Sequence, residues 1–329
     1  MYKLCVLGSG SWGTAISNVI AEGGYDVALW CFLKEEYDML TEFHEHKKYL
    51  PGTKLNDKIK YTCDIEEAVS GTDVIVVATP SFAVRQTVSK IKRVYDGQTV
   101  VCIAKGFEDE TLKCLDEVIS DELKTEKVCA LSGPSHAEEV IKKMPTTLVA
   151  AARDDKTAKT VQDMFMRPYL RVYTSNDILG VELGAALKNI ISLSTGISDG
   201  LGLGDNLKAA LMTRGMAEIV RLGTAMGGKT ETFYGLSGMG DLIVTCTSMH
   251  SRNRRAGILI GQGRTPEEAK KEVGLVVEGI IACESAYKLA KKYNVEMPIV
   301  NEAYNILYKG MAPADAINNL MTRSKKSEW

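Results

Sequence analysis

The chain has 329 residues, of which 45% are hydrophobic and 25% are charged, and its formal net charge is −2. This is an ordinary globular composition with enough length for two domains of usual size. The nearly balanced charge argues against a nucleic-acid partner, so any basic site for an anion must be local.

The cysteines, histidines and apolar runs indicate the cellular compartment of the protein and whether it binds a metal or a membrane. The eight cysteines form no C-x-x-C pair and there are only four histidines, which favours reduced thiols, a cytoplasmic location and no metal site. The N-terminus enters a strand at once, so we expect no signal peptide. No apolar run approaches the roughly 18 residues that span a membrane, so we expect no membrane insertion.

The first half of the chain alternates β-rich apolar runs with helical stretches. The expected strands are Lys3–Leu7, Asp26–Trp30, Asp73–Ala78, Thr99–Ala104, Lys127–Leu131, Thr147–Ala151 and Leu170–Tyr173, with helices between several of them, such as Phe82–Lys92 and Thr111–Leu123. This alternation predicts a mostly parallel sheet covered on both faces.

The pattern changes near residue 175, where Val- and Ile-rich runs give way to helical spacing. The expected helices are 178–198, 207–227, 250–262, 265–273, 278–293 and 298–309. We therefore expect an α/β Rossmann-type domain with a mostly parallel sheet over residues 1–178, followed by a mainly α-helical domain over residues 179–329.

The residues Gly8–Gly13 match the motif G-x-G-x-x-G. An apolar strand precedes them, an apolar-periodic helix follows, and a second strand ends about twenty residues further on. In this context Gly8, Gly10 and Gly13 allow a tight turn and a close approach of the backbone to a pyrophosphate at a helix N-terminus. The alternative is a glycine-rich turn that binds nothing.

Three other strand ends carry chemically distinctive residues. These are Thr79-Pro80-Ser81, Lys105-Gly106 and Ser132–Ala137. Ligands of this fold bind outside the carboxyl ends of the strands, so we expect a shared cleft there. Each segment taken alone is also compatible with an ordinary turn.

The segment Gly180–Asn189 opens the helical half and places Lys188 among small, apolar neighbours. On a helix, Val181, Gly184, Ala185, Lys188 and Ser192 share one stripe. A lysine there can lay its stem along apolar neighbours at the surface. It can also be a buried general acid–base whose pKa is lowered by desolvation and a nearby cation.

Two further segments have both a functional and a structural interpretation. Three glycines in Gly235–Gly240 precede Asp241, which is either a presented carboxylate or a simple helix cap. The arginines of Ser251–Arg255 near a possible helix start suit a phosphate, but they also fit a solvated basic face.

Taken together, these segments resemble the NAD(P)-dependent glycerol-3-phosphate dehydrogenases, and the bacterial members look most similar. The matching stretches are Gly8–Thr14, Tyr49-Leu50-Pro51, Ala104-Lys105-Gly106, Leu131–Ser135, Gly180–Asn189, Gly235–Leu242 with Thr245, Ser251–Arg255 and Val277-Glu278-Gly279. They occur in order from residue 8 to about residue 280 and are jointly far more specific than the glycine motif.

The resemblance implies reversible hydride transfer between a nicotinamide cofactor, NAD or NADP, and C2 of a three-carbon phosphate. One direction reduces dihydroxyacetone phosphate to sn-glycerol 3-phosphate, which supplies glycerophospholipid synthesis. Relatives are often dimers, so a homodimer is possible. No metal is required, because the cofactor carries the hydride.

The resemblance also assigns roles to individual residues. Lys188 matches the general acid–base, Lys105 a second lysine that touches substrate and cofactor, and Asp241 and Thr245 residues that orient Lys188 and the substrate. The remaining substrate contacts are Gly133, Ser135, Ser251, Arg252 and Asn253, and the remaining cofactor contacts are Gly8, Gly10, Ser11, Trp12, Gly13, Phe32, Tyr49, Ala137, Arg252, Val276 and Glu278.

One departure concerns the cofactor. Many bacterial relatives carry a basic pair after the second strand, suited to the 2′-phosphate of NADP. Here the sequence is Trp30-Cys31-Phe32-Leu33-Lys34-Glu35-Glu36, with a single cation and no acidic residue at the strand end. Phe32 could stack on adenine. We therefore expect NAD to be used at least as well as NADP.

Two other functions remain compatible with the sequence. A two-domain dehydrogenase acting on a 3-hydroxy or 2-oxo acid would share this outline but would not need the basic Ser251–Asn253 segment. A redox sensor that binds a dinucleotide without catalysis would need neither Lys105 nor Lys188.

Overall fold

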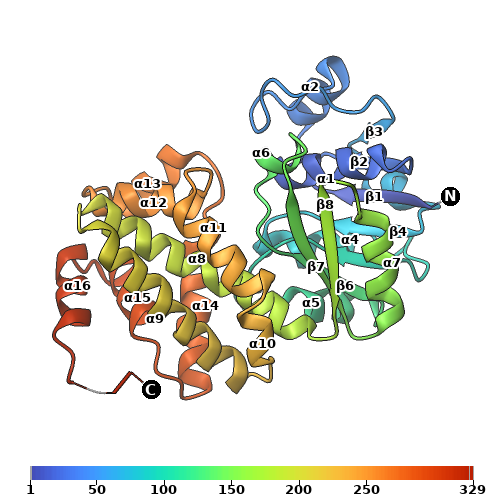
Figure 1. The fold of residues 1–329 in the computed structure, drawn as a ribbon. Helices are drawn as coiled ribbons and strands as arrows, with labels where there is room; N and C mark the ends of the chain where they lie inside the picture. Colours follow the sequence, from blue (N-terminus) through green and yellow to red (C-terminus); the bar gives the residue numbers. More distant parts are fainter. Residues whose placement is uncertain (1, 326, 329) are drawn as a thin grey trace. The chain divides into compact units, whose positions relative to one another are not determined.

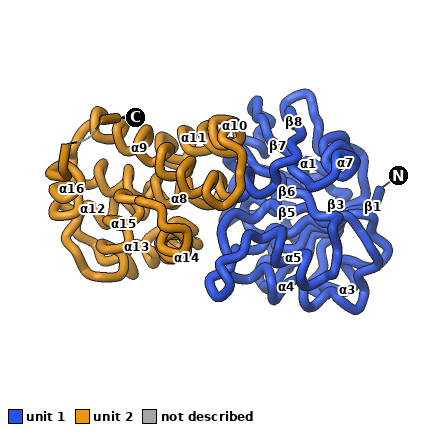
Figure 2. Tube along the Cα trace, turned by 90° about the horizontal axis from the view of Figure 1, so that it is seen from below, with its two compact units in different colours: residues 1–182 blue, residues 183–329 orange. Residues whose placement is uncertain are grey.

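The computed structural model describes residues 2–325 and 327–328. The chain divides into two compact units, Met1–Glu182 and Leu183–Trp329, which Figure 2 shows in blue and orange. The first unit contains a β-sheet with helices and the second is built from helices. This is the division into an α/β half and a helical half that the change of pattern predicts.

The first unit is organised around one sheet of eight strands. They are β1 (Lys3–Leu7), β2 (Asp26–Trp30), β3 (Ile59–Thr62), β4 (Val74–Val77), β5 (Thr99–Cys102), β6 (Val128–Ser132), β7 (Thr146–Ala152) and β8 (Leu170–Ser175). Their order is β3-β2-β1-β4-β5-β6-β7-β8. Only the β6–β7 pair is antiparallel among these neighbours, so the predicted mostly parallel sheet is confirmed.

Helices cover both faces of this sheet (Figure 1). They are α1 (Ser11–Glu22), α2 (Lys34–Phe43), α3 (Ile65–Val69), α4 (Val84–Lys90) with the preceding 3₁₀ turn η1 (Ser81–Ala83), α5 (Leu115–Leu123), α6 (Ala137–Val140) and α7 (Asp155–Phe165). Apolar residues of α1, α6 and α7 form a buried cluster with one face of the sheet, and those of α3, α4 and α5 form another with the opposite face. The strand Val74–Val77 is buried along its whole length, as expected between two helical layers.

All seven predicted strands are present, with ends shifted by no more than two residues. The sequence did not reveal β3, whose residues Ile-Lys-Tyr-Thr are only partly buried. This strand lies at the edge of the sheet. An edge strand needs fewer apolar residues, so its sequence gave no apolar run to detect.

The second unit consists of helices around α8. They are α8 (Ile178–Gly200), which begins in the first unit, α9 (Gly204–Ala225), α10 (Thr230–Phe233), the short π-helical turn η2 (Leu236–Gly240), α11 (Asp241–Thr247), α12 (Arg252–Gly261), α13 (Pro266–Val273), α14 (Glu278–Lys292), α15 (Pro298–Lys309) and α16 (Pro313–Met321). The six predicted helices are confirmed. The short helices α10, α11 and α16 were not predicted.

Helix α8 is long and apolar enough to cross a membrane, contrary to the expectation that no run in this chain approaches that length. The mean hydropathy of its most apolar 18-residue stretch reaches 1.2, and 89% of that stretch is buried inside the protein. A helix that is apolar on all sides can be the core of a helical unit as well as a membrane span. Because α8 is mostly buried, it is the core helix of this unit.

Glycines allow α8 and α12 to approach each other closely. A Cβ atom on Gly257 of α12 would lie 2.1 Å from the backbone oxygen of Leu193, and one on Gly196 of α8 would lie 2.2 Å from the backbone oxygen of Arg254. No side chain fits at such distances. This contact fixes the start of α12 beside the middle of α8, where the polar residues described below are located.

A buried carboxyl group, that of Glu218 on α9, caps the start of α15. Its oxygens accept hydrogen bonds from the backbone N–H groups of Ile299 (2.7 Å) and Val300 (3.2 Å). Burial raises the pKa of Glu218 from 4.5 to about 7, and this outweighs the two N–H donors, which lower it. The folded protein therefore resists the ionisation of this group.

This arrangement predicts a pH dependence of stability. Below about pH 4.5 Glu218 is protonated in both states, whereas between about pH 4.5 and 7 the unfolded chain ionises first, so the free energy of unfolding falls by up to about 3 kcal/mol. We expect Glu218→Gln to flatten this part of the profile in urea unfolding of the full chain. The exposed control Glu231→Gln should keep the wild-type slope. An unchanged slope in Glu218→Gln would contradict the assignment.

Candidate active site

The glycine loop of the first unit has the geometry of an anion cradle. Gly8 has a φ of +120°, and its N–H donates to the backbone oxygen of Trp30 at 3.1 Å. A Cβ on Gly13 would lie 2.0 Å from the backbone oxygen of Gly8, so the turn closes only with glycine there. Helix α1 begins directly afterwards, at Ser11.

The start of α1 is open around Gly10, and its first turn contains no acidic residue. A Cβ on Gly10 would meet no atom within 4 Å, and the first turn of α1, which contains Ser11 and Trp12, has no acidic residue. The backbone N–H groups of a helix N-terminus bind phosphate oxygens. These residues therefore fit the pyrophosphate of a dinucleotide.

Beyond β2 the chain presents an exposed aromatic ring and a paired cation. Phe32 is 67% exposed and packs edge-on against Trp30, with 5.9 Å between the ring centroids. The Lys34 ammonium forms an ion pair with Asp38 at 2.6 Å. Phe32 is thus available for stacking, whereas the cation already has a carboxylate partner.

Sequence reasoning missed an acidic residue at this place. The Glu36 carboxylate, in the first turn of α2, accepts a hydrogen bond from the hydroxyl of Ser9 inside the glycine loop. No local sequence signal shows this, because the bond joins residues 27 positions apart.

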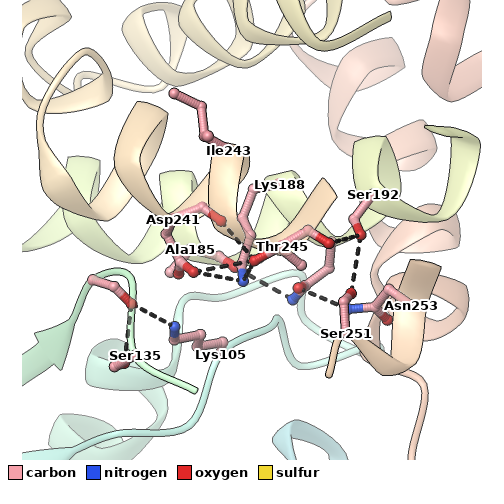
Figure 3. Close-up of polar contacts among 12 residues, drawn as sticks. Lys105, Ser135, Ala185, Lys188, Ser192, Asp241, Ile243, Thr245, Ser251 and Asn253 are labelled. Carbon is pink, nitrogen blue, oxygen red and sulfur yellow. Dashed lines mark hydrogen bonds and ion pairs between the residues drawn. The ribbon is translucent and has the colours of Figure 1, made fainter. Parts of the chain in front are cut away.

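Lys105 and Ser135, which follow β5 and β6, meet at one backbone oxygen. The Lys105 ammonium donates to the Gly133 oxygen at 3.2 Å, and the Ser135 hydroxyl donates to the same oxygen at 3.0 Å (Figure 3). Gly133 has a φ of +146°. Two of the three marked strand ends, Lys105-Gly106 and Ser132–Ala137, are thus in contact, and the shared cleft that would include Thr79-Pro80-Ser81 stays a prediction.

Three predicted cofactor residues of this unit are buried or half-buried. Ala137 is the first residue of α6 and is 6% exposed. Tyr49 packs against His46, with 4.3 Å between ring centroids, and both Tyr49 and Trp12 contact the core cluster on the α1 face of the sheet.

In the second unit, Lys188 of α8 is buried and forms an ion pair. Its ammonium donates to the Asp241 carboxylate at 2.8 Å and to the Thr245 hydroxyl at 2.6 Å (Figure 3). The Thr245 hydroxyl in turn donates to the backbone oxygen of Asp241 at 2.6 Å. Lys188 is 5% exposed, Asp241 2% and Thr245 3%, so the surface interpretation of Lys188 is wrong.

Asp241 is the first residue of α11, as its position after the glycines suggested. The N-cap of α11 is Gly240, and the Asp241 side chain is directed to Lys188. The close approach of η2 to α8 makes this possible: a Cβ on Gly184 would lie 3.2 Å from the Cα of Gly238. Asp241 is therefore a partner of Lys188 and not a simple cap.

Ser192, one turn after Lys188, links this group to α12. Its hydroxyl donates to the backbone oxygen of Thr245 at 2.8 Å and lies 3.1 Å from the Ser251 hydroxyl. Ser251 is the N-cap of α12 and accepts from the N–H of Arg254. The sequence placed Ser192 on the stripe of Lys188 without giving it a role.

Asn253 connects α12 with α8 and α14. Its side-chain N–H₂ donates to the Asn189 side-chain oxygen at 2.9 Å, and its own oxygen accepts from the N–H of Gly279 at 2.8 Å. Val276 and Glu278 lie at the start of α14. Asn189 and Gly279 belong to matching motifs but were not singled out as functional residues.

The remaining basic residues divide between two environments. Arg254 pairs with Asp199 at 2.7 Å, so it holds α12 to the end of α8. Arg252 lies in the first turn of α12, which has no acidic residue. This turn, with Ser251 and Asn253, offers donors suited to an anion.

The thiol of Cys246, which neighbours Thr245, is unreactive. Burial raises the pKa of Cys246, the neighbour of Thr245, to about 11, so it stays protonated at neutral pH. Among the described residues, no group of three or more His, Cys, Asp or Glu side chains could hold a metal ion. The polar group of the second unit is thus an ammonium held by a carboxylate and a hydroxyl.

Comparison with known proteins gives a consistent result for both halves. Residues 3–158 match the model of the NAD-dependent glycerol-3-phosphate dehydrogenase N-terminus, and residues 177–318 match that of the C-terminus. Glycerol-3-phosphate dehydrogenase [NAD(P)+] of Agathobacter rectalis is 51% identical over 100% of this chain and 98% of its own length. The enzyme of that name from Moorella thermoacetica is 53% identical over 99% of this chain and 97% of its own.

A solved structure agrees over nearly the whole chain. The crystal structure of glycerol-3-phosphate dehydrogenase from Coxiella burnetii has a TM-score of 0.94 and 36% identity, covering 98% of this chain and 99% of its own.

The glycine loop allows a test that separates folding from ligand binding. Gly13→Ala places a Cβ against the backbone and should destabilise the protein by about 2 kcal/mol or more. Gly10→Ala meets no protein atom, so its melting temperature should stay that of the wild type, while its dissociation constant for NADH rises about tenfold or more because a methyl group blocks the pyrophosphate. Thermal unfolding measures the stability of each variant, and NADH fluorescence titration measures its dissociation constant for NADH. Unchanged NADH affinity in Gly10→Ala would contradict the cradle.

Proposed function

Because the chain belongs to the NAD-dependent glycerol-3-phosphate dehydrogenase family, we propose that it reduces dihydroxyacetone phosphate to sn-glycerol 3-phosphate, and catalyses the reverse reaction, with Lys188 as the general acid–base. The observation that carries this assignment is the buried ammonium of Lys188 between Asp241 and Thr245. A buried charge is costly unless it is paired, and such groups concentrate at functional sites.

The nicotinamide, when bound, supplies or accepts the hydride at C2 of the substrate. During reduction negative charge develops on the carbonyl oxygen. The Lys188 ammonium would stabilise that charge and donate its proton to the oxygen, so that a new O–H bond forms while Lys188 becomes a neutral amine. In the oxidation of the alcohol the same amine would accept the proton.

Asp241 and Thr245 have complementary roles in this proposal. The carboxylate favours the charged form of Lys188, so the proton is present when the substrate binds. The Thr245 hydroxyl gives its own hydrogen to the backbone, which leaves a lone pair facing the lysine. Together they hold the ammonium in one orientation, which lowers the entropic cost of proton transfer.

The start of α12 is the proposed phosphate end of the site. Ser251, Arg252 and Asn253 lie at a helix N-terminus, where backbone N–H groups and a guanidinium favour an anion. Binding energy from the phosphate would position C2 without taking part in the reaction. Lys105, Gly133 and Ser135 remain the predicted substrate contacts of the first unit, and Lys105 is also a predicted cofactor contact.

The cofactor is the dinucleotide held by the glycine loop, and we expect NAD to be used at least as well as NADP. The support is the composition of the segment after β2, where Lys34 is bound to Asp38. Reduction for lipid synthesis, a homodimer and a cytoplasmic location remain predictions from the resemblance.

The first test is the oxidation of NADH, followed by its absorbance, with dihydroxyacetone phosphate as substrate. We expect rapid oxidation that is lost with unphosphorylated dihydroxyacetone, because the phosphate end then has no partner. A parallel assay with NADPH measures cofactor choice. Equal activity without the phosphate would favour the dehydrogenase of a 3-hydroxy or 2-oxo acid.

The role of Lys188 is tested by Lys188→Ala, in which kcat should fall by at least about 10²–10⁴-fold because the proton donor is lost. The affinity for NADH should stay within about twofold. Lys271→Ala, on an exposed face of α13, is the control. Lys188→Ala leaves Asp241 buried without its lysine, so the double variant Lys188→Met/Asp241→Asn should recover stability but not activity. Full turnover in either variant would refute the assignment of Lys188 as the general acid–base, whereas a wild type that binds NADH but shows no turnover would favour the dinucleotide sensor.

A further inference from the structure

A carboxylate contacts the glycine loop from the element that follows β2. Glu36 lies in the first turn of α2 and is half-buried, and its carboxylate accepts a hydrogen bond from the hydroxyl of Ser9. Ser9 is 3% exposed and lies between Gly8 and Gly10. The negative charge is therefore held in place at the loop.

This position has a specific meaning in the fold. In sheets of this topology the pyrophosphate lies on the first glycine loop, and the segment after the second strand faces the adenosine ribose. A carboxylate there accepts hydrogen bonds from the ribose hydroxyl groups. It repels a 2′-phosphate, because the two like charges would be close together in a partly desolvated site.

The other ionisable groups of this region do not cancel that charge. Burial lowers the pKa of His46, although Glu36 and backbone groups favour its charged form, so this imidazole is neutral at pH 7. The ammonium of Lys34 is paired with Asp38. Lys90 lies 5.5 Å from the centroid of the Phe32 ring, so its charge is directed at the aromatic face.

We propose that Glu36 determines the choice of cofactor in this enzyme: its carboxylate, held by Ser9, selects the free 2′-hydroxyl of NAD and rejects the 2′-phosphate of NADP. This inference rests on the proposed use of NAD. In this proposal Glu36 takes the role of the acidic residue that is missing at the end of β2. Glu36 lies six positions after β2 in the sequence, and its place in the first turn of α2 brings its carboxylate to Ser9 of the glycine loop.

The test compares Glu36→Gln with Glu35→Gln, which removes the same charge from the neighbouring, exposed position. Dissociation constants for NADH and NADPH are measured by nucleotide fluorescence in the absence of substrate. We expect Glu36→Gln to lower the ratio of the NADPH constant to the NADH constant by about tenfold, and Glu35→Gln to change it by less than about twofold.

A second readout uses adenosine fragments, which do not involve the catalytic residues. Competition by AMP and by adenosine 2′,5′-bisphosphate should show the same change of preference, and in the wild type the discrimination should weaken as salt is raised. Ser9→Ala, which releases Glu36, should shift the ratio in the same direction by a smaller factor.

The outcomes separate the two proposals. A wild-type enzyme that binds NADPH more tightly than NADH would overturn the proposed NAD preference and with it this inference. A wild type that prefers NADH, with the same ratio in Glu36→Gln and Glu35→Gln, would leave the NAD preference in place and overturn the role of Glu36. Thermal unfolding of each variant verifies that it is folded.

Discussion

The buried ion pair between Lys188 and Asp241 is the interaction on which the second unit depends. Its two charged groups are 5% and 2% exposed and their atoms are 2.8 Å apart. Removing such charges from water costs several kcal/mol per ion, and an apolar pair of the same size is often as stable or more so. The pair is therefore poorly explained by stability, whereas the proton donor proposed above, which must be charged and held in one orientation, would require it.

The surrounding helices have features that make this pair possible. Glycines on η2 and α8 bring α11 within reach of Lys188, and glycines on α8 and α12 bring Ser251 within reach of Ser192. At each of these contacts there is no room for a side chain, so no apolar side chain fills the space between the two helices there. The helices are packed closely at the points where polar groups must meet, and the apolar cluster of α8, α12 and α14 lies beyond them.

The sequence predicted features that depend on local pattern and missed those that depend on distant contacts. Buried parallel strands are continuously apolar, and the glycine motif carries its own geometry, so the sheet and the cradle could be predicted. The stripe of Gly184, Lys188 and Ser192 was visible as well. The partners of that stripe, 53 to 59 residues away, were not visible from spacing, so Lys188 and Asp241 each kept a structural alternative until their contact was seen. The Glu36–Ser9 bond lacked a local signal for the same reason, and the edge strand β3 lacked one because it has no apolar run.

The candidate sites of the two units differ in the groups that carry positive charge. The glycine loop of the first unit offers backbone N–H groups at a helix whose first turn has no acidic residue, so the helix itself would attract an anion there. The function proposed for the second unit needs a transferable proton, which a backbone amide does not provide at neutral pH but the Lys188 ammonium, held by the Asp241 carboxylate, would provide. The net charge of −2 does not show this difference between the two units, because it sums all charges of the chain. The carboxylates of Asp38, Asp199 and Asp241 each pair with a cation of a candidate ligand region, so the number of basic residues overstates the positive charge there.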